Sequence, residues 1–158
     1  MAGIRREFLA VGGYGTNAHP SETQLEADSS TYKKGAPLIY NGAGRLAEGG
    51  VDAVDLVGTV EQDGQNGTSK TARFSPATSH VIFEGQIDDT TLNGSYAQVA
   101  TSLGLKYGIT KEAASGKWYL DTTKTDARVR VLVVGLKDAA AALYPRVYFT
   151  FLRATTIY

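Results

Sequence analysis

The residues best suited to proton transfer near neutral pH are the two histidines, His19 and His80. His80 follows Thr78 and Ser79, but a serine–histidine relay needs a carboxylate that orients the imidazole, and the sequence places none beside it. The chain has no G-x-S-x-G turn, and its lack of cysteine excludes thiol catalysis and cysteine-ligated metal centres. We therefore expect that the protein is not an enzyme.

Two pairs of carboxylates are the candidates for a metal site, Asp88 with Asp89 and Asp121 with Asp126. Such oxygen ligands suit hard cations, but the Asp-x-Asp-x-Asp-Gly spacing of a calcium loop is absent. The glycine-rich stretches at 12–15 and 42–44 lack the Lys-Ser/Thr pair of a phosphate-binding loop and favour turns instead. We expect no metal and no cofactor.

Four aromatic residues could stack on sugars or bases: Trp118, Tyr119, Tyr40 and Tyr107. Packing in a core or an interface is the more frequent role of such residues. The first role defines an alternative function, a phage tail or baseplate domain or another β module that binds glycans. A third class, an enzyme of unrecognised type, has no residue pattern behind it.

Eighteen glycines, nine tyrosines and one methionine in 158 residues favour a turn-rich β protein over a helical bundle. We expect a mainly β fold, a small antiparallel β-barrel or compact sandwich spanning about residues 36–153. One short helix is expected over 96–103, capped by Ser95 and ended by a left-handed Gly104. The expected strands cover residues 38–40, 54–60, 70–74, 80–87, 117–120, 128–136 and 146–153.

Asn41-Gly42 after the first of these strands predicts a hairpin with a type I′ turn, and the chain resumes at Arg45-Leu46. The strands at 128–136 and 146–153 are apolar on both faces over part of their length. Such strands must be covered on both faces, by an added layer or by a subunit interface.

Residues 1–35 are too polar to build a core of their own, so we divide the chain into an N-terminal arm (1–35) and a β-barrel domain (36–158). The arm carries apolar anchors and two arginines that a purely solubilising tail does not need. We expect it to become ordered against a partner, and we expect deletion of residues 2–15 to leave the fold intact; packing on its own barrel or on a neighbouring subunit is the alternative. The candidate contact residues are Ile4, Arg5, Arg6, Phe8, Leu9 and Tyr14.

Sixteen basic and sixteen acidic residues cancel, which argues against a nucleic-acid partner, and no apolar run is long enough to span a membrane. The charges are segregated along the chain. Residues 48–89 carry eight acids against two bases, and residues 104–158 carry nine bases against four acids. Complementary faces of this kind suit head-to-tail ring association, unless folding interleaves the two segments and removes the asymmetry.

Several strings resemble tailed-bacteriophage capsid decoration proteins, also called head cement proteins. Residues 32–39 read YKKGAPLI and residues 57–67 read VGTVEQDGQNG, close to the "KKGAPL" and "G-I-A-x-x-D-G-x-N" of that family. The resemblance continues through FEG, LGLKYGIT, GKWYLD and RVYFTF at residues 83–85, 103–110, 116–121 and 146–151. It covers about residues 32–153, and its motifs are structural turns and strands.

The resemblance implies a small β-barrel of the lambda-type head decoration fold, on the outer surface of the expanded capsid. It also implies a homotrimer that clamps neighbouring subunits of the major capsid protein. The expected function is thus head stabilisation, and the expected location is the virion, with the host cytoplasm during assembly.

Overall fold

The computed structural model describes residues 8–13, 20–88, 100–138 and 145–157. Within these ranges the protein is mainly β, as predicted. The strands are β1 (Leu9–Gly13), β2 (Glu22–Leu25), β3 (Pro37–Tyr40), β4 (Leu46–Glu48), β5 (Gly58–Val60), β6 (Thr71–Pro76), β7 (Val81–Asp88), β8 (Lys106–Lys111), β9 (Trp118–Asp121), β10 (Val131–Leu136) and β11 (Arg146–Phe151). A single 3-10 turn, η1 (Arg153–Thr155), follows β11.

The first sheet has the strand order β2-β6-β5-β3-β4, and all of its pairings are antiparallel. Its two outer strands approach each other just beyond β2, where Glu26 forms a parallel bridge with Leu46 and the amide of Ala27 donates to the Leu46 carbonyl at 2.7 Å. The five strands therefore curl toward a closed shape at this end.

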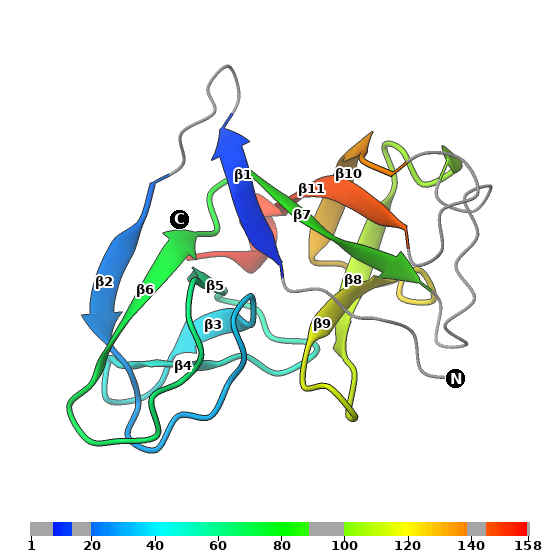
Figure 1. The fold of residues 1–158 in the computed structure, drawn as a ribbon. Coiled ribbons are helices and arrows are strands. Elements are labelled where there is room, and N and C mark those ends of the chain that lie inside the picture. Colours follow the sequence, from blue (N-terminus) through cyan, green and yellow to red (C-terminus); the bar gives the residue numbers. More distant parts are fainter. Residues whose placement is uncertain (1–7, 14–19, 89–99, 139–144, 158) are drawn as a thin grey trace.

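The second sheet has the order β1-β7-β11-β10-β8-β9. A parallel pairing of β7 with β9 closes the last five strands of this order into a barrel. One edge of β7 serves two partners. β1 pairs with Val81–Glu84, and β9 pairs with Ile87 and Asp88 further along. Figure 1 shows β1 crossing in front of β7, between the two groups of strands.

A continuous apolar core joins the two sheets. Its centre in the second sheet is a group of phenylalanines in which Phe83 stacks on Phe149 at 5.7 Å, and Phe151 meets both rings edge to face. In the first sheet Leu38, Leu46, Val60 and Phe74 point inward and are fully buried. This core fixes the positions of the surface features described below.

The division of the chain at residue 35 does not separate an arm from a barrel in the described residues. β1 belongs to the second sheet and β2 to the first, and Tyr32 is buried in the shared core. The boundary was drawn from apolar periodicity, a signal that does not register a strand such as β2. β2 has the sequence ETQL with all four residues exposed, so its hydrogen bonds to β6, rather than buried side chains, hold it in place.

The hairpin of β3 and β4 forms where it was predicted, with Leu38 opposite Glu48 and Tyr40 opposite Leu46. Its turn is not of type I′, because positive φ occurs at Gly44 (71°) and not at Asn41 or Gly42. The side-chain oxygen of Asn41 instead accepts hydrogen bonds from the amides of Ala43 and Arg45, both at 3.0 Å. An asparagine that holds a wider loop in this way replaces the tight two-residue turn.

Residues 96–99 of the predicted helix over 96–103 lie outside the described residues. Of the remainder, Ala100 is helical and 101–104 form a turn. Gly104 has the predicted left-handed conformation, with φ 80°. The described part of the chain contains no helix long and apolar enough to cross a membrane.

Candidate functional site

Phe8, predicted as a contact residue for a partner, lies in the protein's own core and is 1% exposed. Its ring meets Phe149 edge to face, with centroids 5.0 Å apart, and rests directly on β7 at Gly85. A Cβ at Gly85 would lie 2.6 Å from the Phe8 ring, so glycine is needed there for the close approach. The prediction for Phe8 is therefore wrong, and the alternative of packing on the protein's own barrel holds for it.

Leu9 is half-buried and lines a crevice. The other four predicted contact residues, Ile4, Arg5, Arg6 and Tyr14, lie outside the described residues.

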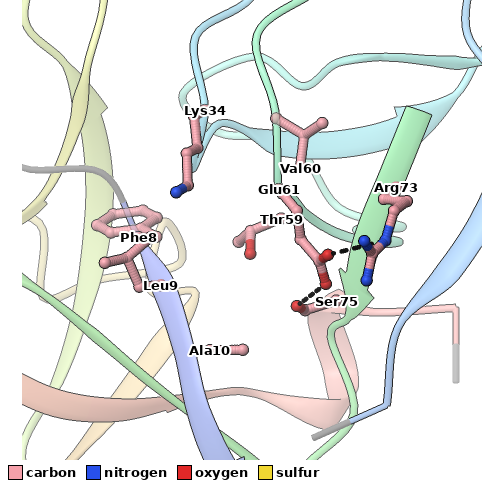
Figure 2. A pocket seen from close by; sticks show the side chains of 9 residues that line it. All are labelled: Phe8, Leu9, Ala10, Lys34, Thr59, Val60, Glu61, Arg73 and Ser75. Atoms are coloured by element: carbon pink, nitrogen blue, oxygen red, sulfur yellow. Dashed lines mark hydrogen bonds and ion pairs between the residues drawn. The ribbon is translucent and has the colours of Figure 1, made fainter.

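The crevice lies between β1 and the outer face of β5 and β6, and has a volume of about 350 Å³ (Figure 2). Strand alternation explains its lining, because Val60 and Phe74 point into the core while their neighbours Thr59 and Ser75 point outward, directly opposite each other. Both outward residues are nevertheless only 1% exposed. Polar side chains on the outside of this sheet are thus covered from above by β1.

Charged groups stand around the crevice. Ser75 Oγ donates to Glu61 Oε1 at 2.9 Å, and Arg73 Nε lies 3.4 Å from Glu61 Oε2. Lys34 projects from the loop before β3, and its ammonium faces the same space (Figure 2). Among the described residues no carboxylate pairs with that ammonium, although the Lys34 backbone amide donates to Asp63 Oδ1 at 2.7 Å.

The aromatic residues of the glycan-binding alternative are mostly buried. Trp118 is 2% exposed, and its indole N–H donates to Glu48 Oε1 at 3.0 Å. Tyr119 and Tyr107 are buried too, and Tyr40 is half-buried. A stacking platform needs an open ring face, which the three buried rings do not offer.

The described residues do not bring His80 together with the carboxylate that a serine–histidine relay would need. His80 lines a shallow cleft with Thr78, Ser79 and Arg153, and no carboxylate is among the lining residues. The described residues contain no group of three or more His, Cys, Asp or Glu side chains that could hold a metal ion.

The two members of the second carboxylate pair have separate partners. Asp121 is buried and accepts hydrogen bonds from the hydroxyls of Thr110 and Thr123, both at 2.6 Å. Asp126 is exposed and forms a two-pronged ion pair with Arg128. The hydrogen bonds from Arg128 lower the pKa of Asp126 to about 2. Both carboxylates therefore act in local structure.

A buried acid that sequence reasoning missed is Glu26, which is fully buried. Its carboxylate accepts the hydroxyl of Tyr32 and, at 3.0 Å, the amide of Gln65. Burial, followed by the hydrogen bond to Glu26, raises the pKa of Tyr32. Nothing in the polar string around Glu26 signals burial, because the partner amide lies 39 positions away.

Folding joins the acidic and the basic segments of the chain to each other. Within the described ranges, four ion pairs connect 48–88 with 104–157: Lys111–Glu48, Lys124–Asp52, Lys137–Glu84 and Arg146–Glu84. The charge segregation is therefore partly consumed inside one subunit. This weakens the electrostatic reason for a ring, although it does not bear on the oligomeric state itself.

Comparisons of the chain with protein-family models, with curated proteins and with solved structures found no match. The described residues define a small β-barrel protein. The barrel belongs to the second sheet, and the five-stranded first sheet packs against it through the shared core. Any more specific function rests on the residues of this chain.

Proposed function

We propose that the protein is a capsid decoration protein of a tailed bacteriophage, which binds the outside of the mature head and stabilises the lattice of the major capsid protein. The observation that carries the proposal is the coincidence of the resembling strings with the framework of a small β fold. YKKGAPLI leads into β3, VGTVEQDGQNG covers β5 and the following turn, and RVYFTF is β11.

Close backbone contacts give those strings a structural reason. A Cβ at Gly64, within the second string, would lie 2.5 Å from the Ser30 carbonyl oxygen. A Cβ at Gly85, within FEG, would meet the Phe8 ring. The resemblance therefore falls on residues that the fold requires, as expected for a family whose shared motifs are structural.

The mechanism needs no catalytic step. A protein that binds the expanded lattice and not the unexpanded or dissociated subunits stabilises the expanded state by mass action. At a free concentration one hundred times the Kd, the gain is about 2.7 kcal/mol for each site. Three-fold clamping multiplies the contact, since a homotrimer presents the same surface to three neighbouring capsid subunits.

The test uses purified expanded heads, assembled from the cognate major capsid protein without decoration. The full chain should co-sediment with expanded heads and not with unexpanded proheads, and should raise the temperature at which the heads dissociate. Cryo-electron microscopy should then show added density on the outer surface at three-fold positions. Failure to bind expanded heads under any salt condition would refute the proposal.

The oligomeric state is tested separately by light scattering, where a trimer has three times the 16.8 kDa mass of the chain. Because the four ion pairs named above lie within one subunit, we expect the trimer to persist in high salt. A monomer at every concentration, with and without heads, would contradict the trimer.

A further inference from the structure

The crevice between β1 and the β5–β6 face contains a hydroxyl with no hydrogen-bond partner among the described residues. Thr59 is 1% exposed, and its Oγ1 makes no hydrogen bond with the described residues. In Figure 2 this hydroxyl faces the open space of the crevice. This hydroxyl is therefore free to bond to a group that enters the crevice.

The charged side chains around the Thr59 hydroxyl determine which charge a bound group should carry. Lys34 and Arg73 contribute two positive charges and Glu61 one negative charge, so the crevice has a net charge of one positive unit. Glu61 already engages Arg73 and Ser75, whereas the Lys34 ammonium has no carboxylate partner among the described residues. A single carboxylate balances this charge, and a doubly charged phosphate would be repelled by Glu61.

The apolar part of the lining sets the remaining chemistry. Phe8, Leu9 and Ala10 line one wall. Phe8 directly precedes β1, and Leu9 and Ala10 are the first two residues of that strand, so this wall lies where β1 begins. A volume of about 350 Å³ lies at the small end of the range for ligand sites.

We propose that this crevice is a binding site for a carboxylate attached to a short apolar chain. The carboxylate accepts hydrogen bonds from the Lys34 ammonium and the Thr59 hydroxyl, and the apolar chain packs on Phe8, Leu9 and Ala10. A free carboxylic acid and a glutamate side chain of another protein present this same group. In its second form the inference rests on the proposed function, because the glutamate would then belong to the capsid.

The experiment titrates ¹⁵N-labelled full-length protein with butyrate and with butyramide, its neutral counterpart, followed by NMR. Butyrate should shift the amides of residues 9–10, 34 and 59–61, and butyramide should bind at least tenfold more weakly. Equal binding of the two, shifts elsewhere, or no shifts up to molar concentration would each overturn the proposal. Inorganic phosphate serves as a second anion, and binding as tight as that of butyrate would also overturn it.

Two variants test the assigned contacts. Lys34→Met and Thr59→Val should each weaken butyrate binding about tenfold. The matched control is Lys33→Met, because Lys33 is the neighbouring lysine, pairs with Asp63 at 3.5 Å and does not line the crevice. Amide spectra and unfolding midpoints show whether each variant keeps its fold. Loss of binding in Lys33→Met equal to that in Lys34→Met would refute the assignment.

A third titration distinguishes the two sources of the carboxylate. N-acetylglutamate methylamide that binds more tightly than butyrate assigns the site to a protein side chain, and weaker binding assigns it to a free acid. With expanded heads that carry no decoration protein, Lys34→Met should then lower head affinity in the first case and leave it unchanged in the second. Failure of the wild-type chain to bind heads would refute the proposed function while leaving the butyrate result intact.

Discussion

Phe8→Ala tests whether β1 is part of the folded protein or a detachable arm. The side chain is 1% exposed and packs on Gly85 and edge to face on Phe149. Truncating a buried phenylalanine costs about 3–5 kcal/mol. Because the crevice opens beside the Phe8 ring, water fills part of the vacated space, and we expect a loss near the lower end, about 3 kcal/mol.

The loss is measured by urea unfolding, followed by Trp118 fluorescence and by circular dichroism. For a chain of this length about 3 kcal/mol corresponds to a decrease in Tm of roughly 6–12 °C. The control is Val11→Ala in the same strand, at a side chain that is 37% exposed, which should change stability by less than about 0.5 kcal/mol.

A loss below about 1 kcal/mol for Phe8→Ala would refute this reasoning, and would restore the sequence-based expectation that residues 2–15 can be removed without unfolding the protein. If the reasoning holds, the same deletion destabilises the second sheet before it affects any partner.

Three further predictions concern buried and charged groups. Tyr32→Phe leaves the Glu26 carboxylate with one hydrogen-bond donor fewer and should cost about 1.5–3 kcal/mol in urea unfolding; an unchanged midpoint would contradict the buried pair. Gly85→Ala should cost about 1–3 kcal/mol through overpacking against the aromatic ring above it, and wild-type stability would show that the ring moves freely. Asp126→Asn removes a carboxyl whose pKa, lowered to about 2 by Arg128, stabilises the fold above the unfolded value of 3.8. The Tm difference between wild type and Asp126→Asn should therefore shrink as the pH falls from 6 to 2, and a constant difference would contradict the ion pair.

Strands with buried apolar residues were predictable from the sequence. The expected strands at 80–87 and 146–153 correspond to β7 and β11, and that at 117–120 corresponds to β9. Each contains residues of the core, so hydrophobic burial alone reveals it.

Other strands were missed. β2 is exposed throughout and is held by its partner strand, whereas β8, with the sequence KYGITK, buries Tyr107 and Ile109 but has a glycine between them. Gly108 allows the Lys124 side chain to cross β8 closely, since a Cβ there would lie 2.6 Å from that side chain. Strand pairing and close packing of this kind depend on distant residues, so they leave no periodic signal in the local sequence.

The crevice could not have been predicted from the sequence for the same reason. Lys34, Thr59 and Arg73 come from three separate segments, and Phe8 from a fourth. Sequence motifs record short-range spacing, whereas this arrangement depends on β1 lying across β5 and β6. Local patterns did place Thr59 in a strand, but the burial of its outward face follows only from the tertiary fold.

The double use of one edge of β7 has a consequence for the order in which the protein is made. β1 leaves the ribosome about 70 residues before the β7 residues with which it pairs, which is roughly 4–14 s at ordinary rates of synthesis. The Phe149 ring that Phe8 contacts follows about 65 residues later still. During that interval the apolar residues of β1 have no native partner, so the barrel can close only after translation of β11, and chaperones have a defined period in which to bind this strand.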